Sequence, residues 1–429
     1  MTLFEPQLVR SYLLSDKGDL FKILLNHYAI NIITSSKLKL HIDRAITIFN
    51  LDSDISVTIF ENFQENFLTK VLNSIFRFGN KSTATIQLIE LRRSLGDSVL
   101  RTWLRYLIYF TLGYSTRLKT ILRLLFYLSI RKKTLKKLFS KEMFLRKGSK
   151  LFITSLTPLR GEDVPIGLYF KKCNIPTVAS VRSWDNLVVN GLLPYLPNTF
   201  LCHSQYMYQG AVRKQGIKAK SIAMSVTPSY QSEFIPNFDQ SEDKEINFSY
   251  MCQGLVMNPD DENFVKWLVS AWEKMPTNFH LYIVQHPAFM MHDLQIKLLP
   301  NIKLVVFHFN ETTLGDYYSH LNKMNLVFGG GTTGILDAAF LNIPVVAIGF
   351  EIQFQNYWES ALRYLDYFSH SADFFKDTNI TIAANKNDLV NIILNYDKIS
   401  VLEREIVLKY TGDPTIKLSD SIINSLSKY

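Results

Sequence analysis

The chain has 429 residues, of which 47% are hydrophobic and 20% are charged. This is the composition of a globular protein, and a sequence without low-complexity tracts or internal repeats excludes a disordered chain and a solenoid. The net charge of +9 is unevenly placed, because residues 117–150 hold twelve Lys or Arg and one acid, Glu142.

The sequence offers few signs of export, membrane spanning or metal binding. Residues 1–10 lack the basic and apolar regions of a secretory signal, so we expect a cytoplasmic protein. No run of about 18 apolar residues predicts a spanning helix. The three cysteines are odd in number and far apart, which favours buried thiols over a disulfide framework or a zinc motif.

The N-terminal half alternates strand and helix patterns. A first strand is predicted at 31–35, whereas 49–113 is mixed α/β with no clear element boundaries. From residue 150 the pattern sharpens. It predicts strands at 151–154, 176–181, 199–203 and 221–224, with helices at 164–174 and 205–215. Such alternation predicts a parallel sheet covered by helices.

A polar stretch at 227–246 predicts a linker, because it contains two prolines and five acids. The alternation then starts again, with strands expected at 248–252, 279–284, 302–307, 326–328 and 345–348. We therefore predict two domains, residues 1–235 and 246–429, with the basic helical segment 117–150 in the first.

The basic segment 117–150 interleaves leucine and aromatic residues with its charges. A helix of this kind can lie on an anionic membrane surface, which makes peripheral attachment at the inner membrane face one expectation. A solvated helix face is the alternative. No nucleic-acid-binding motif accompanies the segment, so we expect no nucleic-acid partner.

Polar residues follow two predicted strands of the first half. Trp184, Asp185 and Asn186 come shortly after the strand ending at Val181. Asp185 is a candidate general base, since a carboxylate in a cleft can accept a proton from a hydroxyl group. The alternative is that Asp185 caps a turn while Trp184 packs in the core. The loop after the preceding strand contains Arg160, Glu162 and Asp163, for which a role in the cleft and a purely structural role are likewise both open.

A glycine-rich turn, 329–334, joins the strand at 326–328 to an apolar helix at 335–341. Glycines permit positive φ and close backbone approach, and free N–H groups at a helix start attract anions. Thr332 and Thr333 add hydroxyl groups. The turn is thus a predicted phosphate site, although a tight strand-to-helix connection would also need glycine. It matches neither the Walker A pattern nor the dinucleotide fingerprint.

Two further residues follow predicted strands of the second half. His286, in a His-Pro pair, is suited to donating a hydrogen bond to a phosphate or carboxylate. Glu351 is suited to accepting hydrogen bonds from ribose or sugar hydroxyls. The alternatives are a structural His-Pro pair and an ordinary exposed acid.

Together these motifs resemble those of GT-B glycosyltransferases, and among them the bacterial enzymes of surface-polysaccharide (capsule, lipopolysaccharide, O-antigen) synthesis related to CDP-glycerol glycerophosphotransferases. The resemblance covers about residues 150–420. It is carried by Ser183-Trp184-Asp185-Asn186, Gln285-His286-Pro287, Asp316-Tyr317-Tyr318 before Gly329 to Thr333, and Leu336-Asp337-Ala338-Ala339 before Ile343-Pro344-Val345-Val346.

The resemblance implies an α/β protein with two Rossmann-like domains whose parallel sheets face across a cleft. The first would bind the acceptor and the second a nucleotide-sugar donor, without a metal or other cofactor. It implies donor contacts from His286, Gly330, Gly331, Thr332, Thr333, Asp337 and Glu351. Acceptor contacts would come from Arg160, Trp184 and Asn186, and catalysis from Asp185 and Asp163.

One departure from the family pattern concerns charge. Val284 stands two residues before the His-Pro pair, where the family often has Arg or Lys. This favours a donor with a single phosphate as a hypothesis.

We predict a glycosyltransferase that moves a sugar to a glycan or lipid-linked acceptor. The alternatives are a nucleotide-sugar 2-epimerase, which can share the architecture, and a non-catalytic scaffold that binds glycan or a partner.

Overall fold

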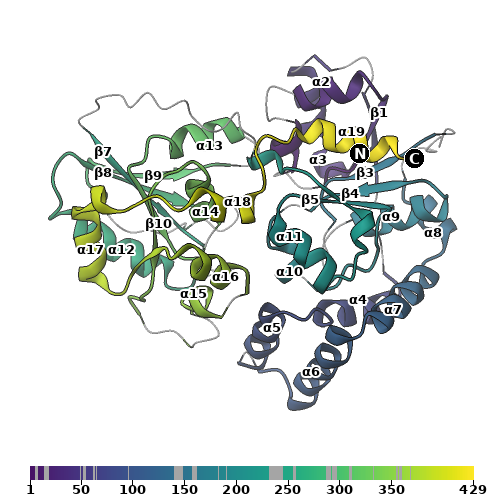
Figure 1. Cartoon of the computed structure of the whole chain (residues 1–429), viewed down its shortest axis with the longest axis horizontal. Coiled ribbons are helices and arrows are strands. Elements are labelled where there is room, and N and C mark those ends of the chain that lie inside the picture. The colour runs from purple at the N-terminus through teal and green to yellow at the C-terminus, as the bar shows by residue number, and fades with distance from the viewer. Residues whose placement is uncertain are drawn as a thin grey trace. The chain divides into compact units, whose positions relative to one another are not determined.

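The structure is a computed structural model of the chain. It describes residues 1–429 except 5–7, 14–18, 49, 52–54, 61–62, 64, 95, 140–147, 157–161, 182, 190, 231–244, 255–257, 287–290, 292–296, 309–311, 332, 354–355, 357–359 and 368. The chain forms two compact units (Figure 1). Unit 1 comprises Met1–Gln231 and Tyr410–Tyr429, and unit 2 comprises Ser232–Lys409.

The sheet of unit 1 is parallel. Its main part has the order β3-β4-β5-β6, formed by Leu151–Ile153, Thr177–Ala179, Thr199–Cys202 and Ile222–Met224. A second pair joins β1 (Ile30–Thr34) to β2 (Ile55–Ile59). Thr2 bridges β1 and β3 by pairing with Ile33 and Ile153, so the first residues of the chain connect the two parts of the sheet. The predicted strands at 31–35, 151–154, 176–181, 199–203 and 221–224 are confirmed, with ends shifted by one or two residues.

Helices surround this sheet. The predicted helices correspond to α9 (Asp163–Lys172) and to α11 (Gln205–Gln209), which continues as a π-helix over Gly210–Lys214. The others near the sheet are α2 (Asp19–Leu25), α3 (Ser36–Ile48), α10 (Asn186–Val189) and α19 (Leu418–Ser427). Fully buried residues such as Ile153, Ile166, Phe200 and Met207 fill the space between helices and sheet.

Residues 65–139, between β2 and β3, are almost entirely helical. They form α4 (Phe67–Phe78), α5 (Thr83–Ser94), α6 (Val99–Tyr114), α7 (Thr116–Ser129) and α8 (Lys132–Lys136). Side-chain N-caps set three of these helix starts, because Asn66, Ser98 and Ser115 each accept a hydrogen bond from the backbone three residues later. The α/β alternation predicted for 49–113 is therefore limited to β2 among the described residues.

Two cations of the basic segment serve the packing of α7. Lys119 is buried and donates to the carbonyls of Gly113 and Lys214, at 3.4 and 2.9 Å. Arg123 donates to the carbonyls of Leu193 and Gln215, both at 2.8 Å. Burial lowers the pKa of Lys119 to about 8 and that of Arg123 to about 10. These two side chains hold α7 to the rest of unit 1 instead of facing solvent. Residues 140–147 of the basic segment lie outside the described residues.

Unit 2 is built on a six-stranded parallel sheet of order β12-β11-β10-β7-β8-β9. The strands are β7 (Ile246–Met251), β8 (Phe279–Gln285), β9 (Ile302–Val306), β10 (Leu326–Gly329), β11 (Val345–Ile348) and β12 (Thr381–Ala383). The helices are α12 (Asp261–Trp272), α13 (Leu314–Leu321), α14 (Thr333–Phe340), α15 (Arg363–Asp366), α16 (Ser369–Thr378) and α17 (Lys386–Leu394). The chain leaves unit 2 within α18 (Arg404–Thr411), whose last two residues are counted with unit 1. The five predicted strands are confirmed, and the short β12 is the one that the sequence pattern missed.

The end of the chain departs from the predicted domain division. The sequence predicts a single domain over 246–429, but Tyr410–Tyr429 belong to unit 1. The Tyr410 ring lies 5.6 Å from the ring of Trp184 and 5.0 Å from that of Tyr206. Tyr429 Oη lies 3.0 Å from Thr199 Oγ1. These contacts join residues that are more than 200 positions apart in the sequence, so the hydrophobic periodicity of a local segment cannot predict them. The predicted linker, 227–246, falls largely outside the described residues.

The cysteines are free thiols. Cys202 and Cys252 are buried as expected, whereas Cys173 is half-buried. No helix among the described residues has both the length and the apolar character needed to cross a membrane.

Candidate functional site

The sheet of unit 2 has a topological switch point between β7 and β10. From β7 the chain first adds β8 and β9 on one side, and then β10, β11 and β12 on the other. Met251 pairs with Gly329 at the carboxyl ends of these two strands. Parallel α/β sheets bind ligands in the crevice outside such a pair of strand ends. The candidate site is therefore the two segments that follow, 252–254 and 330–331.

The glycines of the turn are required by close approach. A Cβ atom on Gly330 would lie 2.5 Å from Gln253 Oε1, and one on Gly331 would lie 2.4 Å from Tyr364 Cβ. Neither glycine has a positive φ, so conformational freedom, which the sequence also suggested as a reason for glycine, is not what these two positions require. The missing Cβ atoms let the side chains of Gln253 and Tyr364 pack directly against the backbone of the turn.

Gln253 is the polar side chain at this point that the sequence analysis missed. It is 5% exposed, and its Oε1 has no hydrogen-bond partner among the described residues. Leaving a buried amide oxygen unpaired costs about 1–3 kcal/mol, so such atoms mark places where a further donor belongs. Gln87 Oε1 is also buried and unpaired, so what distinguishes Gln253 is its place beside Gly330 at the switch point.

The helix after the turn begins at Thr333, which is exposed, while Thr332 lies outside the described residues. The N–H groups of this first turn and the helix dipole favour an anion. Asp337, one turn further on, is buried and accepts a hydrogen bond from Tyr317 Oη at 3.0 Å. That hydrogen bond joins α13 to α14, so Tyr317 and Asp337, which belong to two of the motifs that carry the family resemblance, have a structural role.

Two adjacent carboxylates fix the loops around the switch point. Asp261 accepts hydrogen bonds from Gly254 N at 2.7 Å and Tyr250 Oη at 2.5 Å, and burial raises its pKa to about 6. Asp260 accepts from Ile352 N at 2.5 Å and Gln353 N at 3.2 Å. The first carboxylate holds the loop after β7, and the second holds the loop that carries Glu351. An acidic pair opening a helix was visible in the sequence, but nothing local showed its partners.

The remaining candidates of the second half follow neighbouring strands. His286 comes directly after β8 and is half-buried, and Glu351 follows β11 and is also half-buried. Since β8 adjoins β7 and β11 adjoins β10, both residues lie at the carboxyl edge that holds the glycine turn. Val284 is buried within β8, so its position belongs to the core. Pro287 lies outside the described residues.

In unit 1, the structure separates the candidates by burial. Asp163 opens α9 and is 4% exposed, and Asn186 opens α10 and is buried. Trp184 is buried, with its ring 5.8 Å from that of Tyr206. Asp185 is half-buried, and its carbonyl accepts from Val188 N at 2.8 Å. Asp185 and Glu162 are thus both half-buried, whereas Asp163 is buried, and Arg160 lies outside the described residues.

A buried serine–histidine pair also lies in unit 1. Ser180 Oγ and His203 Nε2 are 2.6 Å apart, directly after β4 and β5. Both side chains are buried, and burial lowers the pKa of His203 to about 4. Because the His203 imidazole is neutral and enclosed, its hydrogen bond with the Ser180 hydroxyl serves the interior of the fold.

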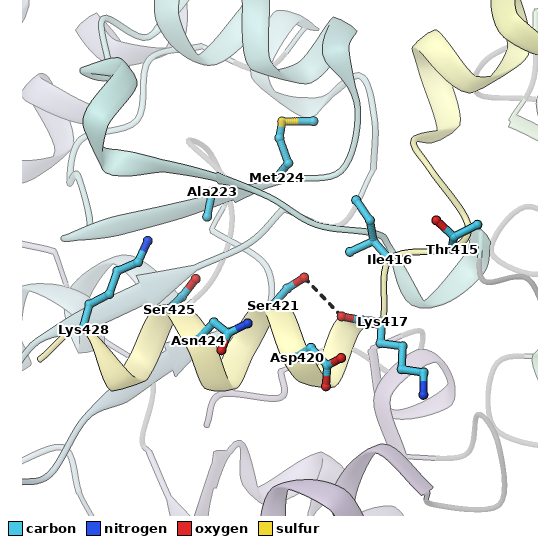
Figure 2. A pocket seen from close by; sticks show the side chains of 10 residues that line it. All are labelled: Ala223, Met224, Thr415, Ile416, Lys417, Asp420, Ser421, Asn424, Ser425 and Lys428. Atoms are coloured by element: carbon cyan, nitrogen blue, oxygen red, sulfur yellow. Dashed lines mark hydrogen bonds between the residues drawn. The ribbon is translucent and has the colours of Figure 1, made fainter.

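Unit 1 also has an open groove of about 440 Å³ between β6 and α19. In Figure 2 the side chains of Ser421, Ser425 and Lys428 point from α19 toward the strand that carries Ala223 and Met224. Lys417 and Asp420 complete its charged lining. None of the residues predicted from sequence lines this groove.

Comparison with known proteins shows the fold. No family model and no curated sequence matches the chain. The S. aureus MnaA–UDP co-structure matches with a TM-score of 0.50 and 12% identity, over 100% of this chain and 96% of the other. The UDP-GlcNAc 2-epimerase from Methanocaldococcus jannaschii matches with a TM-score of 0.50 and 10% identity, over 100% of both chains. The chain therefore has the GT-B fold, with two Rossmann-like units, as the sequence predicted.

Proposed function

We propose that this chain is an enzyme that binds a nucleotide-sugar at the switch point of unit 2. The proposal rests on one observation: the buried side chain of Gln253, whose Oε1 has no partner among the described residues, packs against Gly330 of the glycine turn at the carboxyl ends of β7 and β10. Similar folds whose structures are named for UDP and UDP-GlcNAc support this choice of ligand.

The proposed site holds phosphate largely without side-chain cations. The N–H groups of Gly330, Gly331 and the first turn of α14, with the Thr333 hydroxyl, would bind the phosphate oxygens. Gln253 would pair its amide with the base or ribose, and His286 and Glu351 would contact the phosphate and the sugar. Donors fixed before the reaction stabilise the charge that develops on a departing phosphate. Asp337 would contact the nucleotide-sugar indirectly, through the Tyr317 hydroxyl that donates a hydrogen bond to it.

For the reaction we propose glycosyl transfer. The hydroxyl oxygen of an acceptor forms a bond to the anomeric carbon, the bond from that carbon to the phosphate oxygen breaks, and a carboxylate takes the hydroxyl proton. Asp185 is the proposed base because Asp163 is more deeply buried. The proposed acceptor is a glycan or lipid-linked glycan of surface-polysaccharide synthesis, as in the enzymes that the motifs resemble.

A second candidate function is 2-epimerisation of a nucleotide-sugar. The similarity to the UDP-GlcNAc 2-epimerase of M. jannaschii favours it. The two reactions use the same nucleotide site but differ in whether a sugar carbon inverts in the absence of an acceptor.

Incubation of the purified chain with single nucleotide-sugars, followed by proton NMR, tests the proposal. After UDP, GDP, CDP, CMP and dTDP have been compared for stabilisation of the protein, sugars on the selected nucleotide are used. For a transferase we expect no inversion at the sugar carbon, and release of free nucleotide that increases when acceptor is added. Inversion at carbon 2 without acceptor would replace the transferase proposal by the epimerase. Failure of every nucleotide to stabilise the chain would refute both.

A further inference from the structure

The helices α6 and α7 of unit 1 carry apolar side chains on their exposed sides. Of 23 exposed large hydrophobic residues among those described, twelve lie within 99–128. On α6 they are Val99, Leu100, Trp103, Leu104, Leu107, Phe110 and Tyr114; on α7 they are Leu118, Ile121, Leu124, Leu125 and Leu128. We call these twelve residues the apolar stripe.

The apolar stripe follows helical periodicity. Its members recur every three or four residues along each helix, so they form one face. The opposite faces are already packed, since Thr102, Tyr109 and Leu112 of α6 and Lys119 and Phe126 of α7 are buried in unit 1. The two helices therefore have one apolar face that the fold uses and a second that it leaves in solvent. Apolar patches on this scale mark interaction sites.

The charge around the stripe identifies the partner. Residues 98–139 contain ten Lys or Arg and no acid. Among them, Arg117, Arg131 and Lys137 are exposed. Asp97, just before α6, pairs with Arg101 and Arg105, and the other cations of 98–139 give the region a net positive charge. An apolar face with a net positive border complements an anionic lipid surface, in which acyl chains take up the apolar side chains and headgroups attract the cations. Pairing of two copies through this face would bring two such positive regions together, which repulsion opposes.

We propose that α6 and α7 dock this protein on an anionic lipid bilayer, with the apolar stripe in the headgroup and acyl boundary. At 16 and 14 residues the helices are too short to span the hydrocarbon core, so they lie along the surface. The charge pattern of the sequence predicts this property for 117–150. The structure shifts it to 99–128, because Lys119 and Arg123 face the protein and the exposed apolar residues extend across α6.

Trp103 gives a fluorescence readout of docking. It is 71% exposed, whereas Trp267 is half-buried and Trp184 and Trp272 are buried; Trp358 lies outside the described residues. Vesicles of phosphatidylcholine with 30% phosphatidylglycerol should shift the tryptophan emission of the full chain to shorter wavelength, and vesicles of phosphatidylcholine alone should not. In a Trp103→Phe variant the shift should disappear. No shift with anionic vesicles would overturn the proposal.

Vesicle co-sedimentation tests the two parts of the surface separately. A variant with Leu107→Ser, Phe110→Ser, Ile121→Ser and Leu125→Ser should lose binding, while Leu394→Ser with Val401→Ser, exposed positions in unit 2, should keep it. Replacing Arg117, Arg131 and Lys137 by Gln should weaken binding by about 100-fold, since each cation near an anionic surface contributes about 1 kcal/mol. The charge control is Lys218→Gln with Lys220→Gln, which removes two exposed lysines elsewhere in unit 1.

The outcomes separate this proposal from others. Equal binding of neutral and anionic vesicles, or loss of binding in the control variants alone, would overturn it. So would an analytical ultracentrifugation result in which the wild type is a dimer and the serine variant a monomer, because the stripe would then join two copies. The measurements use no nucleotide, so the proposed function can fail while lipid binding holds, and the reverse.

Discussion

A Gln253→Leu variant is expected to lose nucleotide binding while keeping its fold. The change removes the one amide that the structure places beside Gly330, at nearly constant side-chain volume. Loss of hydrogen bonds to a polar ligand should weaken binding by about 10- to 100-fold. Stability should change little or rise, because the variant replaces an unpaired buried amide by an apolar group. Stabilisation by the selected nucleotide, followed as the melting temperature, measures both effects.

Gln87→Leu is the matched control for that experiment. Gln87 is a buried glutamine of unit 1 whose Oε1 also has no partner among the described residues. If Gln253 acts on the ligand, only the Gln253 variant should lose the nucleotide-dependent shift. Equal retention of the shift in both variants would remove Gln253 from the site. Gly331→Val would be a poorer probe, because its Cβ would strike Tyr364.

Gly412→Ala is expected to destabilise unit 1 strongly. Gly412 has a φ of +93°, and a Cβ atom there would lie 1.8 Å from the carbonyl oxygen of His203. The backbone would have to move, and the contacts of Tyr410 and α19 would move with it. We expect a loss of more than about 3 kcal/mol in the free energy of unfolding, measured by urea titration.

Gly96→Ala separates the two causes of that loss. Gly96 has a φ of +95°, but no atom lies within 4 Å of its Cβ position. Its cost should be that of the left-handed backbone alone, about 1 kcal/mol. Similar losses in the two variants would show that Gly412 does not fix the C-terminal segment against His203.

The sequence predicted the parts of this fold that have a local signal. Buried strands such as 326–328 and 345–348 are short uninterrupted runs of apolar residues, and the turn at 329–334 is a compact glycine cluster. The short strand β12 and the caps of α4, α6 and α7 lacked a comparable signal. The return of Tyr410–Tyr429 to unit 1 depends on long-range contacts, which no periodicity records.

The candidate site was predictable only in part. The glycine turn, His286 and Glu351 were visible because they follow strong strand patterns, and the sheet order brings their strand ends to one edge. Gln253 was not, because a single glutamine before a glycine has no distinctive spacing. Its meaning comes from the pairing of Met251 with Gly329, two strands that are far apart in the sequence.

Hydrogen–deuterium exchange with and without the selected nucleotide is the direct test of nucleotide binding at the switch point. We expect slower exchange in two stretches, 252–254 after β7 and 329–336 at the turn and the start of α14, because their N–H groups would bind or adjoin the ligand. Slower exchange confined to other parts of the chain, such as the groove residues 415–428, would contradict it, as would no change with any nucleotide.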